Sequence, residues 1–436
     1  MTRQKFNVLR YNKLLFIVLS STVFSAYGLD SAQIIQVKIV AQVAMDVEQD
    51  QSTIPGVVTA IADDTSVIWQ GVSNCDTQYE TSGMACPASN VTTSDQYRVG
   101  SESKTYAGTV ILRMIDEGHL SLSDTLQSLL PALNIPNASS ITIQDLLQMT
   151  SGIPDYLNAP ALFGDSGTIN DQYVRANGAL EITPPSVYIM ATNSQARTSG
   201  MSYSNTNFAI LGLIAEAKSC DIFTGCQTLE QLLTHYVMTP VSMTETLLPD
   251  DDQFTQAHAT GYVMVEAGQP ITGTASLESD DANELSDAFT FLNPKLPWAA
   301  GAIVSTPGDQ ILWNRQLTKN NLGLLSASLQ NQRLTNTVPG SVAGIPANYG
   351  LAIYNMRSDY NGSTFIGHSG AIFGFTSSLF YNTDSDLFYV VNANQFPAWQ
   401  SARDFLWQVD KGVHFVEDQQ EIAKGTLHRC LRHVRD

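Results

Sequence analysis

Strand-forming patterns lie at both ends of this chain, and helical patterns fill its middle. Near the start, 56–61 and 66–71 are rich in β-branched residues and flank an acidic turn, as in a β-hairpin. Near the end, strand patterns return at 349–354, 377–381 and 387–392. At 436 residues the chain is long for a single core. The pattern predicts an α/β fold: a mixed, mostly antiparallel sheet flanked by helices and built from both chain ends, with a mainly helical insert as a second lobe.

Helical periodicity is clearest at 103–117, where apolar residues fall on one face and Gly118 is suited to end the helix. Further helical patterns cover 143–148, 208–217, 228–237 and 398–409. We therefore expect one folded unit at 29–423. Its α/β lobe would comprise about 29–120 and 290–412, and its helical lobe about 121–289.

Both termini differ from the body of the chain. Four basic residues and no acidic ones precede the apolar run 14–19, and small residues follow at Ala26 and Gly28. This arrangement is typical of a secretory signal peptide, here residues 1–28. The apolar stretch of about 15 residues is short for a membrane span, so an uncleaved anchor is the alternative. The C-terminal tail, 424–436, is basic, and we expect it to be a mobile end.

The cysteines support the same compartment. Cys75 and Cys86 are 11 residues apart, and Cys220 and Cys226 are 6 apart, which predicts two local disulfides. Buried free thiols are the alternative, and Cys430 is left over. Together with the signal peptide, the cysteines predict a periplasmic or secreted protein with no stable membrane span.

The charge balance argues against a nucleic-acid partner. The chain has 22 Lys+Arg against 41 Asp+Glu, a formal net charge of −19, and its body shows no basic stripe. Its acidic loops are typical of solvated segments, and its histidines lack metal-ligand spacing. We expect no metal site, no cofactor and a monomer.

The first candidate for chemistry is Ser101 with Lys104, an S-x-x-K motif at the start of the 103–117 helix. The spacing puts the Ser101 hydroxyl and the Lys104 amine on one face. A serine hydroxyl is a poor nucleophile until a base removes its proton, and a desolvated lysine can serve as that base. A helix N-terminus in addition stabilises an oxyanion formed on that serine. The motif alone is weak, although Lys104 is the only one of nine lysines with a serine three residues before it.

The second candidate pairs Tyr203 with Asn205, directly before an apolar helical run. The phenol could relay a proton, and the amide could hold the lysine or a substrate carbonyl. Residues 156–158 have the same Y-x-N form, but they do not lead into such a helix.

The third candidate is the H-x-G formed by His368 and Gly370. A strand edge at this place could put a hydrogen-bond donor or cation beside Ser101, with the Ala371 N–H as an oxyanion donor.

Taken in order, S-x-x-K, Y-x-N and H-x-G resemble the motifs of the penicillin-recognising serine hydrolases. The similar branch contains class C β-lactamases, D-alanyl-D-alanine carboxypeptidases, D-aminopeptidases and esterases. The resemblance covers about 55–409 and implies a sheet lobe beside a helical lobe, with the site between them. It also implies that Ser101, Lys104 and Tyr203 are catalytic, and that Asn205, His368, Gly370 and Ala371 bind substrate.

His368 stands where class C β-lactamases usually have lysine, so the resemblance favours a carboxypeptidase or esterase over a β-lactamase. The substrate would be a small peptide, such as a peptidoglycan stem peptide, an ester or a β-lactam. Two other hypotheses remain: a non-catalytic binding protein on the same fold, and a G-x-S-x-G nucleophile elbow at 367–371 with Ser369 as nucleophile and a histidine from the C-terminal segment.

Overall fold

The computed structural model describes residues 31–51, 54–75, 86, 90–160, 168–169, 200–265, 284–286, 290–342, 344–359, 361–396 and 403–414. The expected signal peptide and the basic tail with Cys430 lie outside these residues. No helix in the described part of the chain combines the length and apolar character needed to cross a bilayer.

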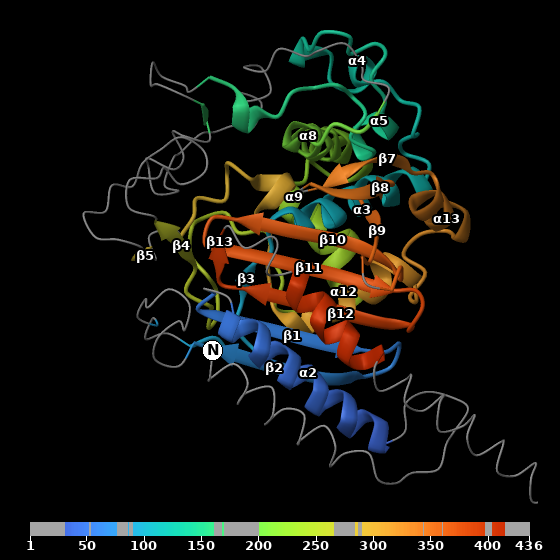
Figure 1. Ribbon diagram of the computed structural model, residues 1–436. Coiled ribbons are helices and arrows are strands. Elements are labelled where there is room, and N and C mark those ends of the chain that lie inside the picture. Colours follow the sequence, from blue (N-terminus) through green and yellow to red (C-terminus); the bar gives the residue numbers. More distant parts are fainter. Residues whose placement is uncertain are drawn as a thin grey trace, which may run out of the picture.

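An eight-stranded antiparallel sheet forms the centre of the molecule (Figure 1). Its N-terminal hairpin lies beside C-terminal strands, because β1 pairs with β2 on one side and with β12 on the other. This arrangement confirms a sheet built from both chain ends. In spatial order the strands are β2 (Val67–Asn74), β1 (Gly56–Ala62), β12 (Leu387–Ala393), β11 (Phe375–Asn382), β10 (Thr364–Ile372), β9 (Tyr354–Arg357), β8 (Ile345–Tyr349) and β7 (Val338–Val342).

Helices cover both faces of the sheet (Figure 1). One face carries α2 (Ser31–Gln51), which sequence patterns did not predict, and the helix at 403–414, close to the expected closing helix. These two helices pack tightly, since a Cβ on Gly412 would lie 2.4 Å from the Val40 side chain. The other face carries α12 (Pro307–Lys319), whose Trp313 ring stacks on Tyr106 of α3 (Ser103–Asp116). The predicted helix is thereby confirmed, although its residues 103–112 are buried on every side.

In the described part of the middle of the chain, helices predominate over strands, as expected. Side-chain caps start two of its helices: Thr142 and Asp145 cap α5, and Thr228 and Gln231 cap α9. The middle helices are α4 (Leu126–Leu129), α5 (Ile143–Leu147), α8 (Asn205–Ile222), α9 (Leu229–Leu233) and α10 (Thr239–Val241), with a π turn (Thr234–Met238) and 3-10 turns η2 (Pro131–Leu133) and η3 (Tyr156–Asn158). After them come α11 (Trp298–Gly301) and α13 (Ala327–Thr335).

Two small sheets complete the described fold. One contains β13 (Gln395–Phe396), β4 (Tyr262–Val265) and β5 (Glu284–Ser286), so strands occur inside the range expected to be helical. The other pairs β3 (Tyr97–Arg98) with β6 (Val304–Ser305), which brings the chain just before the S-x-x-K motif close to the end of α11.

The single strand expected at 349–354 is wrong. β8 ends at Tyr349, β9 begins at Tyr354, and the apolar residues between them form a buried turn with Ala352 at φ +61°. Two hydrogen bonds satisfy the backbone of this buried turn: the Leu351 N–H donates to the Arg333 carbonyl, and the Ala352 N–H donates to a carbonyl of α5. An apolar run of this length fits a buried turn as well as a buried strand.

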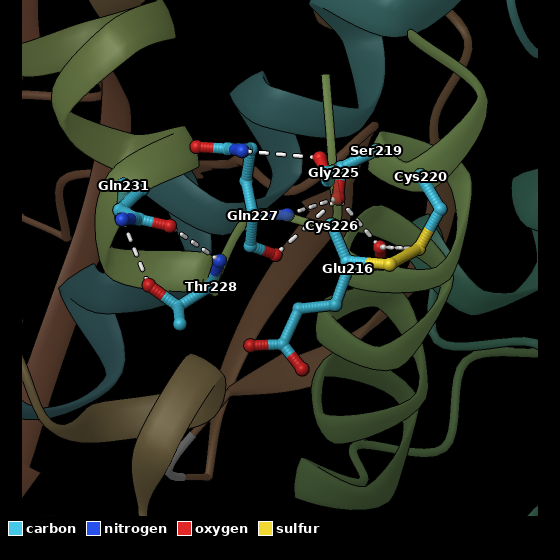
Figure 2. The surroundings of a disulfide bond; sticks show 8 residues. All are labelled: Glu216, Ser219, Cys220, Gly225, Cys226, Gln227, Thr228 and Gln231. Atoms are coloured by element: carbon cyan, nitrogen blue, oxygen red, sulfur yellow. Dashed lines mark hydrogen bonds between the residues drawn. A yellow bond between two sulfur atoms is a disulfide. The ribbon is translucent and has the colours of Figure 1, made fainter. Parts of the chain in front are cut away.

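Both expected disulfides are present. Cys75 pairs with Cys86 after β2, and Cys220 at the end of α8 pairs with Cys226. Figure 2 shows the second bridge closing the loop that leads into α9. Within this loop the Ser219 hydroxyl accepts from the Gln227 N–H at 2.7 Å and donates to the Glu216 carbonyl at 2.6 Å. The bridge and these bonds hold α8 against α9.

Candidate active site

Ser101 lies in η1 (Gly100–Glu102), a 3-10 turn directly before α3. This turn crosses strand β10. The crossing requires two glycines. A Cβ on Gly100, whose φ is +52°, would lie 2.6 Å from the Ala371 nitrogen, and a Cβ on Gly370 would lie 1.9 Å from the Val99 carbonyl oxygen. The backbones therefore meet with no side chain between them, which places Ser101 beside Ala371.

Lys104 points back to Ser101 from the first turn of α3. Its Nζ donates to Ser101 Oγ at 2.9 Å, to Asn205 Oδ1 at 2.7 Å and to the Ala300 carbonyl at 2.7 Å. The side chain is fully buried, and burial lowers its pKa to about 7, although the Asp155 carboxylate acts in the opposite direction. Near neutral pH the amine is thus able to lose a proton and act as a base toward Ser101.

Asn205 connects Lys104 to a buried carboxyl group that sequence reasoning did not assign. Its Nδ2 donates to Asp155 Oδ2 at 2.8 Å and its backbone N–H donates to the same oxygen at 3.2 Å. These bonds turn Oδ1 of Asn205 toward Lys104. Burial raises the pKa of Asp155. The chain from Asp155 through Asn205 therefore fixes where the lysine amine can sit.

Tyr203 lies in the loop before α8, with its ring centroid 5.0 Å from the Lys104 Nζ. Removal from water raises the pKa of the phenol well above its usual value, while its interaction with the Ser101 side chain acts in the opposite direction. The phenol stays protonated at neutral pH. It can therefore donate to a leaving group or pass on a proton that Lys104 has taken.

His368 lies on β10 and is fully buried. The Tyr349 hydroxyl is 3.0 Å from its Nε2, and its Nδ1 contacts the Ser369 carbonyl. A neutral ring with its proton on Nδ1 satisfies both contacts and has no further N–H to offer. Burial and the nearby Lys104 charge lower the pKa of His368 to about 3. At neutral pH this side chain supplies no positive charge to a substrate carboxylate.

Ser369 points to the opposite face of the sheet from His368, as alternate strand residues do. Its Oγ is 2.6 Å from the Tyr354 hydroxyl, and its N–H donates to the same oxygen at 3.0 Å. β10 continues to Ile372, so the strand-to-helix turn of a nucleophile elbow is absent here. His414 lies in the helix at 403–414 and pairs with Asp410. The elbow hypothesis does not fit this geometry.

A cavity of about 200 Å³ opens on the Ser369 side of the sheet. Its polar lining includes Tyr354, Ser369, Ser377 and Arg403. The Arg403 guanidinium packs over the Trp407 ring at 4.6 Å. The cavity thus places the Arg403 cation beside polar residues of β9, β10 and β11.

The structure brings Ser101, Lys104, Tyr203 and Asn205 into one cluster, with Gly370 and Ala371 against the serine turn. Sequence reasoning missed two groups in this cluster. Asp155 lies within the range 55–409 that resembles the family, yet a single aspartate in a loop gives no separate signal. Ala300 acts through its carbonyl, which leaves no trace in the residue type.

Comparison with known families decides the relationship. The Beta-lactamase family model matches residues 42–411. The chain belongs to the beta-lactamase family. The similarity to penicillin-recognising serine hydrolases is thereby confirmed, and the mixed α/β architecture with its large antiparallel sheet is the beta-lactamase fold.

Solved structures share this beta-lactamase fold. A D-stereospecific amidohydrolase from Streptomyces sp. is 24% identical, covers 84% of this chain and 97% of its own, and has a TM-score of 0.65. A D-amino acid amidase from Ochrobactrum anthropi SV3 is 18% identical, covers 89% of this chain and 99% of its own, and has a TM-score of 0.69. Among curated relatives, Protein flp of Staphylococcus aureus (strain MW2) is 26% identical over 174 residues. That match spans 39% of this chain and 31% of the relative's length.

Proposed function

We propose that this protein is a serine hydrolase that forms an acyl-enzyme on Ser101. The observation that carries the proposal is the buried Lys104 amine, 2.9 Å from Ser101 Oγ and anchored on two further oxygen atoms. A buried amine with a pKa of about 7 is suited to take the serine proton at neutral pH.

The proposed reaction has two halves. Lys104 takes the Ser101 proton while Oγ attacks the substrate carbonyl, and the oxyanion receives hydrogen bonds from the backbone N–H groups of Ser101 and Ala371. Tyr203 then transfers its proton to the leaving group as the carbonyl–leaving group bond breaks, and it takes from Lys104 the proton that came from Ser101. A water molecule, activated by the same two side chains, releases the acid and restores Ser101.

For the substrate we propose a small peptide, with D-alanyl-D-alanine carboxypeptidase-like cleavage as the first candidate. Such a substrate ends in a carboxylate, and Arg403 with Ser369 lines a polar cavity beside β10 that suits one. Hydrolysis of a neutral amide or ester is the second candidate, because His368 supplies no charge and the solved structures with this fold include a D-stereospecific amidohydrolase and a D-amino acid amidase. We place β-lactam hydrolysis behind both, and we propose that the protein acts as a secreted or periplasmic monomer.

Intact-mass analysis after treatment with a fluorophosphonate or a penicillin tests the nucleophile. We expect an adduct on the wild-type protein and on Ser369→Ala, and none on Ser101→Ala. An adduct on Ser101→Ala would refute the assignment, and no adduct on the wild type with any acylating probe would favour the non-catalytic binding protein.

Matched substrates separate the candidates: a D-Ala-D-Ala peptide, its C-terminal amide, a p-nitrophenyl ester and nitrocefin. A carboxypeptidase should prefer the free carboxylate and lose that preference in Arg403→Gln. Equal cleavage of acid and amide would favour the amidase or esterase. Fast turnover of nitrocefin alone would overturn the proposed substrate class.

A further inference from the structure

Glu102 directly follows Ser101, and its side chain is fully buried on the far side of η1 from Lys104. One carboxyl oxygen, Oε2, accepts from Gln310 Nε2 of α12 at 2.8 Å. Gln310 is fixed in turn by Asn392 of β12, whose Nδ2 donates to Gln310 Oε1 at 2.6 Å. The amide of Gln310 therefore donates to Glu102, and the proton of a neutral acid would belong on the other oxygen, Oε1.

No cation contacts this carboxyl group within the described part of the chain. The titratable groups that surround it are Tyr106 of α3, Tyr354 of β9 and, beyond Tyr106, Asp309 of α12. Lys104 turns away toward Ser101, Asn205 and the Ala300 carbonyl. Burial therefore raises the pKa of Glu102 to about 8, although hydrogen bonds to Ser377 and Gln310 oppose the change. A carboxyl group without a counter-ion in such a place is neutral at neutral pH.

The Ser377 hydroxyl of β11 joins Glu102 to the nucleophile turn. Its Oγ donates to the Val99 carbonyl at 2.9 Å, two residues before Ser101, and it also interacts with the Glu102 carboxyl group. Apart from that interaction, Oε1 of Glu102 is buried without a well-formed hydrogen bond among the described residues. A neutral acid resolves this, because its O–H can donate to Ser377 while Ser377 donates to Val99.

We propose that Glu102 is a positioning residue that acts as an un-ionised acid, holding the Ser101 turn against β11 through Ser377, and that its ionisation releases the turn and lowers activity. The Ser377 hydroxyl has a single proton. When Glu102 becomes a carboxylate, it competes with the Val99 carbonyl for that proton, so the turn loses a bond that fixes its distance from β10 and the Ala371 N–H. This inference rests on the proposed role of Ser101.

The test is the pH dependence of the rate at which a fluorophosphonate phosphonylates Ser101, measured from pH 5.5 to 10. The wild-type rate should fall above pH 8 by about tenfold per pH unit, as expected when one required proton is lost. Glu102→Gln keeps both hydrogen bonds with a carboxamide that cannot ionise. It should therefore stay within about threefold of the wild type at pH 7 and show no alkaline decline. Ser377→Ala should react with the fluorophosphonate more slowly at every pH.

Asp309→Asn is the matched control, because it removes another buried carboxyl group whose pKa is also raised by burial. It should keep the alkaline decline. A decline that persists in Glu102→Gln, or a wild-type protein without one, would overturn the proposal.

A second measurement does not depend on activity. Amide hydrogen exchange of residues 97–103, corrected for its intrinsic pH dependence, should speed up above pH 8 in the wild type and not in Glu102→Gln. Failure of the proposed function alone would abolish acylation but leave this difference intact. Equal protection in the two proteins would overturn the inference.

Discussion

Replacement of Glu102 by glutamine should stabilise the protein at alkaline pH, because it removes a carboxyl group that must ionise in the interior. Burial raises the pKa from 4.5 to about 8. A raised carboxyl pKa means that the folded state binds the proton more tightly than the unfolded chain. The stability that this proton contributes is complete below pH 4.5 and is lost as the pH rises through about 8. The wild type should therefore lose about 3 kcal/mol of unfolding free energy relative to Glu102→Gln between pH 5 and 8. This is an upper value, because water that reaches the carboxylate would reduce it.

Chemical denaturation of both proteins at several pH values measures this difference. The two unfolding curves should lie close together at pH 5 and separate steadily toward pH 8, with equal dependence on denaturant. Ser101→Ala provides the control, since it removes a neighbouring group that does not titrate in this range. A difference between wild type and Glu102→Gln that stays constant with pH would show that the carboxyl group already ionises near its ordinary pKa, and it would refute the argument.

Two further predictions concern the reacting groups and the turn that holds them. Burial lowers the pKa of Lys104 to about 7, so the fraction of unprotonated amine grows with pH, and the acylation rate should rise from pH 5.5 to about 8. Tyr203→Phe should keep this rise, but steady-state kinetics should show turnover lowered by about 10² or more. Gly370→Ala would place a Cβ 1.9 Å from the Val99 oxygen, so acylation should fall by at least about tenfold. Gly308→Ala, whose Cβ would meet its nearest atom at 3.9 Å, should acylate like the wild type, and equal loss in both would contradict this account.

The fold was predictable where the spacing of apolar residues along the sequence matches the repeat of a helix or a strand. The hairpin of β1 and β2 and the helix α3 follow from alternation and from helical spacing. The turn at 350–353 could not be recognised in this way. Its N–H groups donate to carbonyls of α5 and of Arg333, which come from other parts of the chain. Local composition records that such residues are buried, but not whether the chain extends or reverses among them.

The candidate site was predictable only where the motifs carry side chains that react. Ser101 and Lys104 interact through their spacing along one helix start, so the sequence contains their geometry. The pKa of Lys104 is instead lowered by burial and raised by Asp155, and both effects exist only after distant parts of the chain have packed around the amine. His368 shows the same limit in reverse. Its residue type predicts a donor or cation in the site, yet the Tyr349 hydroxyl and the Ser369 carbonyl occupy both ring nitrogens. Residue type sets what a side chain can do, whereas the partners that the fold supplies decide which of those roles is left to it.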